Sequence, residues 1–225
     1  MHPAQLWRHL RMLRLCAALR TATIFVSVLG LCSGISQLAH AGASPQNQDR
    51  SYHRLGQKPN PRVKMVVEKR GTIVVELYQK ECPKTTAHFL SLVNRKFYDR
   101  TLFHNVVRGF MATAGDPKSK TVDGAKIATL SSYDVATRYG LGGGGSGKTV
   151  PLEPHAGHDK GTIGLQHGAR SIDSGDSQFF FNLDDNHTND GAYTVFGKIT
   201  QGINVMDNIK QGDRILTIRV VPLAQ

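Results

Sequence analysis

The chain has 225 residues, of which 40% are hydrophobic and 20% are charged, values ordinary for a globular protein. This length suits one domain with a sizeable core. The formal net charge is +11, and after residue 41 the chain keeps 24 basic and 17 acidic residues, scattered along its length. Scattered charge favours an ordinary solvated surface over a nucleic-acid-binding patch, so we expect no nucleic-acid partner.

Residues 1–41 have the pattern of a cleavable signal peptide. Four arginines, the last of them Arg20, and no acidic residue make this segment positive. The mostly apolar stretch 21–39 follows, and Ala39-His40-Ala41 offers the small residues of a cleavage site. We expect cleavage after Ala41, export to the periplasm or the cell exterior, and only transient contact with the membrane. The alternative is an uncleaved membrane anchor, because 19 uncharged residues approach the length of a bilayer span.

Residues 42–62 are polar and rich in Pro, Gln and Asn, which predicts a flexible linker before a folded domain over 63–225. In that domain, β-branched runs and apolar residues at helical spacing predict strands and two helices. The predicted strands are 63–68, 72–78, 102–107, 110–114, 162–166, 178–183, 194–199 and 215–221. The predicted helices are 83–95 and 203–209, and 116–160 is a long polar, Gly-rich loop. Many strands without regular βαβ alternation predict a mainly β fold, a closed antiparallel β-barrel capped by two helices.

Three cysteines are present, and two of them, Cys16 and Cys32, lie in the predicted signal peptide. Cys82 is then alone in the mature chain, which excludes an internal disulfide. Its neighbour Pro83 and the predicted helix after it favour a packed or turn position over a redox role.

The segment Gly142–Thr149 satisfies the pattern G-x-x-x-x-G-K-[ST] of a phosphate-binding P-loop. A P-loop also needs a helix directly after the motif, whose N-terminus holds the anion. Here Pro151, Pro154 and Gly157 follow, and no helix runs through them. We therefore expect a surface loop that binds no nucleotide.

Histidines offer a possible metal site, since His155 and His158 are three residues apart and His167 and His187 follow. The first two lie among Pro and Gly residues, which supply no scaffold on which ligands converge. We expect exposed loop histidines and no metal.

Two short segments, 103–116 (FHNVVRGFMATAGD) and 177–181 (SQFFF), resemble the signature segments of the cyclophilin family of peptidyl-prolyl cis/trans isomerases. The resemblance extends from about Lys64 to about Val221, and the Gly-rich loop resembles one in bacterial members. It implies a cyclophilin barrel, a monomer, and catalysed rotation about the X–Pro bonds of polypeptide substrates. Such rotation breaks no bond, so it needs an apolar pocket and hydrogen-bond donors but no cofactor.

The resemblance also implies which residues form the site. Asn105 and Gln178 match the catalytic positions, where Gln178 orients the substrate backbone. The substrate-binding positions, which include the proline pocket, fall on Phe110, Met111, Thr113, Leu165, Gln166, His167, Phe180, Asn189 and Tyr193. A purely structural role for Phe110 and Phe180, as core residues of a barrel, is the alternative.

One departure from the family pattern bears on activity. The family's arginine, which reaches the prolyl nitrogen, is replaced by Asn105, a shorter and neutral donor. Arg108 is not expected to replace it, since side chains of a strand alternate between faces. Three functions remain open: an exported isomerase of reduced activity that assists protein folding, a proline-peptide-binding chaperone with little turnover, and nucleotide binding through Gly142–Thr149.

Overall fold

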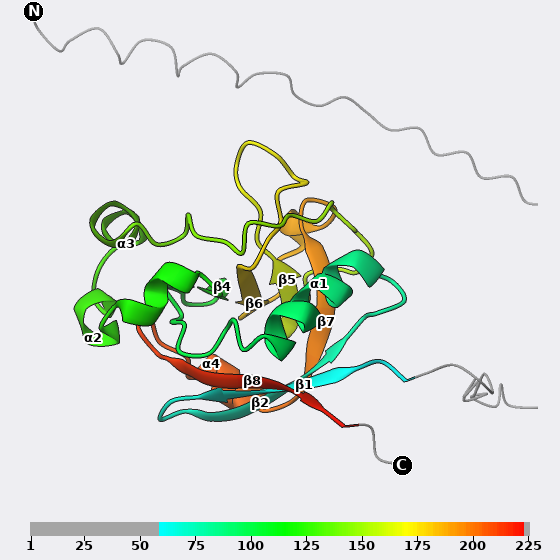
Figure 1. Cartoon of the computed structure of the whole chain (residues 1–225), viewed down its shortest axis with the longest axis horizontal. Helices are drawn as coiled ribbons and strands as arrows, with labels where there is room; N and C mark the ends of the chain where they lie inside the picture. Colours follow the sequence, from blue (N-terminus) through cyan, green and yellow to red (C-terminus); the bar gives the residue numbers. More distant parts are fainter. Residues whose placement is uncertain (1–58, 223–225) are drawn as a thin grey trace, which may run out of the picture. The chain divides into compact units, whose positions relative to one another are not determined.

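A computed structural model describes residues 59–222, so the predicted signal peptide and nearly all of the predicted linker lie outside it. Within this range eight strands form one antiparallel sheet (Figure 1). The strands are β1 (Arg62–Val67), β2 (Gly71–Leu77), β3 (Asn105–Val107), β4 (Met111–Ala114), β5 (Thr162–Leu165), β6 (Phe179–Asn182), β7 (Thr194–Gln201) and β8 (Ile215–Val221). Their order across the sheet is β3-β4-β6-β5-β7-β2-β1-β8. The predicted mainly β, antiparallel class is confirmed.

The sheet curls towards a barrel, but its closure is only partial. β3 and β8 are the edge strands, and the contact between their flanks is an isolated bridge of Leu102 with Arg214. Beside this bridge the Phe103 N–H donates to the Asp213 carbonyl at 2.9 Å. The prediction of a closed barrel therefore overstates the closure. A closed barrel needs a continuous ladder of backbone hydrogen bonds between the two edge strands, and only a few such bonds are present.

The two predicted helices are present with slightly earlier ends than expected. α1 (Pro83–Asn94) packs against β7 and β8, and α4 (Ile203–Asp207) packs against β2. Alternate residues of the strands point to the interior and meet these helices there. The largest members of this shared core are Met65, Ile73, Leu77, Phe89, Leu92, Tyr98, Phe103, Phe179, Phe181 and Phe196.

Residues 117–141 are a structured insertion, which corrects the expectation of an unbroken loop over 116–160. The insertion consists of η1 (Pro117–Thr121), α2 (Gly124–Ile127) and α3 (Ser132–Tyr139). Gln211 ties it to the barrel by donating to the Ile127 carbonyl at 2.6 Å. A second apolar cluster, formed by Leu102 together with Ile127, Val135 and Leu141 of the insertion, also joins the insertion to the segment before β3. No helix within residues 59–222 is long and apolar enough to cross a membrane.

Cys82 is fully buried immediately before α1, and its Sγ lies 3.3 Å from the Val195 carbonyl oxygen. Burial raises the pKa of this thiol to about 12. The predicted packed position is confirmed, and the thiolate, which is the reactive form, is suppressed.

The N-terminus of α1 is capped from a distant part of the chain. Its own N-cap residue, Cys82, makes no side-chain cap. The Glu153 carboxylate instead accepts the N–H groups of Lys84 at 3.1 Å and of Thr85 at 2.8 Å. A carboxylate at this end also interacts favourably with the helix dipole. Glu153 thus joins the loop after the glycine-rich segment to α1.

We predict that Glu153→Ala lowers the free energy of unfolding by about 1–2 kcal/mol, because it removes the cap of α1. Glu153→Gln keeps an acceptor and should lower it less. The measurement is urea denaturation followed by circular dichroism, with exposed Glu81→Ala as the matched control. Equal losses for the Glu153→Ala and Glu81→Ala variants would show that the cap contributes nothing.

Candidate active site

The outer face of the sheet carries a row of residues from four neighbouring strands. Asn105 of β3 is paired with Thr113 of β4. Thr113 is in turn paired with Phe180 of β6, which lies opposite Gly164 of β5. Side chains of directly paired residues point to the same side of a sheet. Phe179 belongs to the core, so the row that contains Phe180 faces outward.

Phe180 is fully buried although it lies outside the main core cluster. Its ring stacks on His158 with 5.8 Å between the centroids, and Tyr193 meets it edge-on at 5.6 Å. Tyr193 also stacks on His167 at 4.3 Å. Gly164 makes room for the Phe180 ring, because a Cβ atom at this position would collide with it. A ligand therefore reaches Phe180 only after a covering side chain, such as Tyr193, turns away.

Asn105 is half-buried at the end of this row, where α3 of the insertion approaches it. The Ser132 hydroxyl donates to Asn105 Oδ1 at 2.7 Å. Asn105 Nδ2 is left as a donor without an acceptor among residues 59–222. Arg108 is exposed in the turn after β3. The row thus ends in a neutral amide donor whose orientation is set by Ser132.

Gln178 is buried beside the row, and its side-chain amide donates to the Gly144 carbonyl at 2.7 Å. Together with Gln166 and His167 it lines a cavity of about 450 Å³, whose wall also includes glycines of the segment 142–147. This cavity brings three of the predicted site residues together.

Three further predicted residues lie around the row. Met111 precedes Thr113 by two residues on β4 and therefore shares its outer face. Phe110 is half-buried in the turn between β3 and β4. Asn189 ends η2 (His187–Asn189), and its Nδ2 is a buried donor without a hydrogen-bond partner among the described residues.

Two residues lie differently from expectation. The Leu165 side chain belongs to the core, because Leu165 alternates with Gly164 along β5, so only its backbone can face the site. His158, expected in an exposed loop, is fully buried because its ring packs on Phe180. The Asn182 amide lies 3.1 Å from its Nδ1.

Ser132 and His158 were not among the predicted site residues. Ser131 caps the N-terminus of α3 by accepting the N–H of Asp134, and the Ser-x-x-Asp spacing is a sequence signal for such a cap. That signal reveals the helix but not the contact of Ser132 with Asn105. The position of His158 has no local signal, since it follows from stacking between distant segments.

The glycine-rich segment directs its N–H groups at carboxylates of the chain itself. Gly142 and Gly144 donate to Asp116 at 2.7 and 2.9 Å. Gly147 donates to Asp176 at 2.9 Å. The element that follows the segment is strand β5, not the helix of a P-loop. A phosphate would have to displace both carboxylates to reach these N–H groups. The absence of nucleotide binding in the manner of a P-loop stays a prediction.

Within residues 59–222 no three His, Cys, Asp or Glu side chains are grouped so that they could hold a metal ion. The expectation that the protein uses neither metal nor cofactor stays a prediction.

Comparison with known proteins identifies the family. A family model described as "Cyclophilin type peptidyl-prolyl cis-trans isomerase/CLD" matches residues 62–222. A peptidyl-prolyl cis-trans isomerase of Helicobacter pylori is 36% identical over 155 residues, which cover 66% of this chain and 80% of the relative. Peptidyl-prolyl cis-trans isomerase B of Bacillus subtilis is 33% identical over 159 residues, 69% of this chain and 94% of the relative. The chain belongs to the cyclophilin family of peptidyl-prolyl cis-trans isomerases, and the predicted enzyme class is confirmed.

Solved structures support the same fold. A cyclophilin type peptidyl-prolyl cis-trans isomerase of Cryptosporidium parvum matches with a TM-score of 0.59 at 23% identity, covering 73% of this chain and 99% of that chain. A structure of the same parasite protein in the presence of the dipeptide Ala-Pro has a TM-score of 0.57, also at 23% identity, and covers 72% of this chain and 99% of that chain. At this identity the likeness shows the fold, and the roles of the individual site residues stay predictions.

We predict that stability falls as the pH drops below about 6.5. Burial lowers the pKa of His158 and of His104 below the usual value of 6.5. Below that pH the unfolded chain therefore binds more protons than the folded one, and the free energy of unfolding should fall by up to about 1.4 kcal/mol per pH unit for each ring. The loss of stability disappears well above pH 7, where both rings are neutral in the folded and in the unfolded state.

Urea denaturation between pH 5 and pH 8 measures this slope. The His158→Gln variant should lose about half of it, whereas the variant of exposed His155→Gln should keep it. A slope that His158→Gln leaves unchanged would show that other groups control stability in this range.

Proposed function

We propose that this protein is an exported peptidyl-prolyl isomerase of reduced activity that assists the folding of exported proteins. The observation that carries this proposal is the row in which Asn105, Thr113 and Phe180 lie side by side on the outer face of the sheet. It combines an aromatic ring, against which a proline can pack, with a hydrogen-bond donor. These are the two elements that the rotation requires.

The reaction is rotation about a partial double bond with a barrier of roughly 18–20 kcal/mol. A donor directed at the prolyl nitrogen weakens amide resonance and so stabilises the twisted state. Asn105 Nδ2 takes this role. Ser132 fixes the orientation of the Asn105 amide by donating a hydrogen bond to its Oδ1. Because Asn105 is neutral, its hydrogen bond is weaker than one from a charged donor. We therefore infer a slower rotation than a guanidinium would give at this position.

Substrate binding in this proposal begins with a movement of Tyr193. Phe180 is fully covered, and Tyr193 meets its ring edge-on. When Tyr193 turns aside, the proline ring packs against Phe180 and Met111. Gln178, fixed by Gly144, orients the substrate backbone, and the adjoining cavity of about 450 Å³ accepts the neighbouring side chain.

A second function, a proline-peptide-binding chaperone with little turnover, uses the same surface. The neutral side chain of Asn105 favours it, because a site can bind the ground state without stabilising the twisted one. Rate and affinity measured on the same peptide distinguish the two functions.

We predict that Asn105→Arg raises kcat/KM for an Ala-Pro peptide by about tenfold or more with little change in affinity, because one preorganised donor typically contributes about 10²–10³ in rate. Ser132→Ala should lower the rate by a smaller factor. Phe180→Leu should weaken peptide binding, because it reduces the apolar surface that meets proline.

The measurements are a coupled isomerisation assay and calorimetric affinity, with Arg108→Ala in the exposed turn as the control. If the wild-type protein catalyses isomerisation as fast as efficient isomerases do, and Asn105→Arg does not raise the rate, another group stabilises the twisted state. If the Phe180→Leu variant binds the peptide with unchanged affinity, the Phe180 ring does not contact the substrate.

Export rests on residues 1–41, whose arginines, apolar stretch and Ala39-His40-Ala41 have the order of a signal peptide. We predict that the native mature protein begins at or near Gly42 and is found outside the cytoplasm. N-terminal sequencing of the native protein checks this prediction. An intact Met1 on a chain that remains with the membrane fraction would support the uncleaved anchor instead.

A further inference from the structure

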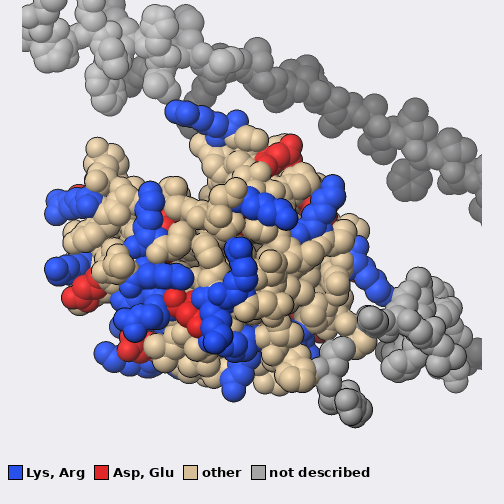
Figure 2. All heavy atoms as spheres, viewed as in Figure 1, with Lys and Arg blue, Asp and Glu red and all other residues tan. Residues whose placement is uncertain are grey.

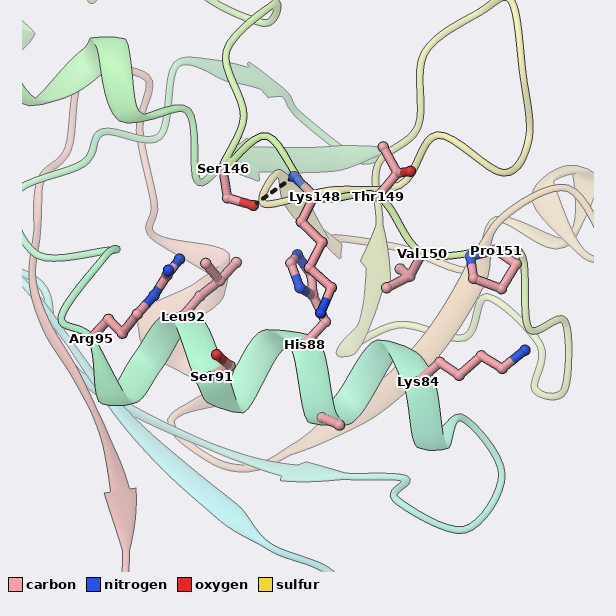
Figure 3. Close-up of a pocket in the computed structure, with 11 residues that line it drawn as sticks. Lys84, His88, Ser91, Leu92, Arg95, Ser146, Lys148, Thr149, Val150 and Pro151 are labelled. Atoms are coloured by element: carbon pink, nitrogen blue, oxygen red, sulfur yellow. Dashed lines mark hydrogen bonds between the residues drawn. The ribbon is translucent and has the colours of Figure 1, made fainter.

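A second cavity, of about 560 Å³, lies between α1 and the segment 146–151 (Figure 3). Its volume is within the range of small-molecule sites. Lys84, His88 and Arg95 line it from α1, and Lys148 lines it from the opposite segment. No residue of the row with Phe180 lines it, and Thr149 is the lining residue that it shares with the cavity of about 450 Å³ beside Gln178.

The charge of this cavity is one-sided. Lys84, Arg95 and Lys148 are its charged lining residues apart from a histidine, and no carboxylate lines it. None of the three forms an ion pair with a carboxylate in the described part of the chain, whereas Arg70 and Arg219 elsewhere do. Figure 2 shows that basic side chains are also more widespread than acidic ones on the face that carries α1. A concave surface with one sign of charge concentrates ions of the opposite sign.

Two of these cations point into the space between α1 and the segment 146–151. In Figure 3 the Lys148 side chain descends from its loop towards α1 and ends beside His88. The side chain of Arg95, the C-cap residue of α1, extends from the end of the helix towards Ser146. Lys84 lies at the other end and points outward. The arrangement leaves ammonium and guanidinium donors directed into one space.

His88 supplies an independent indication of a ligand. Its side chain is only 6% exposed, and its ring stands up from α1 into the cavity in Figure 3. Nε2 has no hydrogen-bond partner, and the nearest carboxylate oxygen, Asp176 Oδ1, is 3.5 Å away. That carboxylate already accepts the hydroxyl of Ser146 and the N–H of Gly147. Nε2 therefore has a carboxylate at ion-pair distance but no hydrogen bond within the described residues, and a ligand oxygen would supply that bond.

We propose that this cavity binds a chain of linked phosphates. Phosphate oxygens accept hydrogen bonds from Lys148 Nζ, the Arg95 guanidinium and His88 Nε2. In Figure 3 Lys148 ends beside His88 and Arg95 extends towards Ser146, so the two cations lie in different parts of the cavity. Several linked phosphates can contact both, and a cavity of about 560 Å³ has room for them. No Phe, Tyr or Trp side chain lines the cavity, so we expect a nucleobase to add little to binding.

This binding mode differs from a P-loop although Lys148 belongs to the motif-like segment. The backbone N–H groups of that segment are held by Asp116 and Asp176. Only the side chain of Lys148 is available, and it points to the opposite side, towards α1.

Calorimetry with inorganic phosphate, tripolyphosphate and ATP tests the proposal on the full chain. Tripolyphosphate should bind more tightly than inorganic phosphate and at least as tightly as ATP, and its binding should weaken as salt is added. Lys148→Ala and Arg95→Ala should each weaken it roughly tenfold, since each removes a charged donor. Lys148→Arg, which keeps the charge, should retain most of the affinity. Isomerase activity should be unchanged in all three.

Exposed Lys64→Ala on β1 and Lys198→Ala on β7 are matched controls that remove one charge elsewhere. If the two controls lose as much affinity for tripolyphosphate as Lys148→Ala and Arg95→Ala do, the proposal is wrong. The binding would then reflect diffuse attraction of an anion to a basic protein. Undetectable binding of tripolyphosphate at low salt would also overturn it. Tighter binding of ATP than of tripolyphosphate, still lost in Lys148→Ala, would assign the cavity to a nucleotide and refute the phosphate-chain class.

Discussion

The arrangement of the site depends on one buried carboxylate, that of Asp116 at the end of β4. It accepts N–H groups from Lys118, at the start of the insertion, and from Gly142 and Gly144, in the glycine-rich segment. Gly144 needs to be glycine there, because a Cβ atom would collide with the carboxylate. Its carbonyl then fixes Gln178. A single charge therefore sets the positions of the insertion, the cavity wall and one predicted catalytic amide.

The insertion changes the surroundings of Asn105 as well as the outline of the barrel. α3 places the Ser132 hydroxyl on the amide oxygen, so the side chain is oriented by an element outside the sheet. A neutral donor gains more from such orientation than a charged one, because it has less electrostatic attraction with which to align itself.

The sequence predicts an element well where a local pattern specifies it. It predicts the orientation of a side chain poorly where contacts between distant segments determine that orientation. The hairpin of β1 and β2 follows from β-branched residues around Gly71, and α1 follows from apolar residues at helical spacing. The three phenylalanines 179–181 are equally apolar, so only the pairing of β6 with β4 and β5 shows that Phe180 alone faces outward. The prediction that His158 is exposed is wrong, because its ring stacks on Phe180 and is thereby buried. Leu165 was assigned to the wall by resemblance, which specifies a position but not which face its side chain takes.

The buried position of Cys82 has a consequence for thiol–disulfide exchange with other proteins. A helper of folding meets unfolded chains whose own cysteines are exposed and, in an oxidising compartment, ready to exchange disulfides. Attack on such a partner requires a thiolate that can reach it. With its Sγ enclosed before α1 and its pKa raised to about 12, Cys82 offers neither. In the folding role that we propose, the domain would therefore not form a mixed disulfide with thiol-bearing substrates through Cys82.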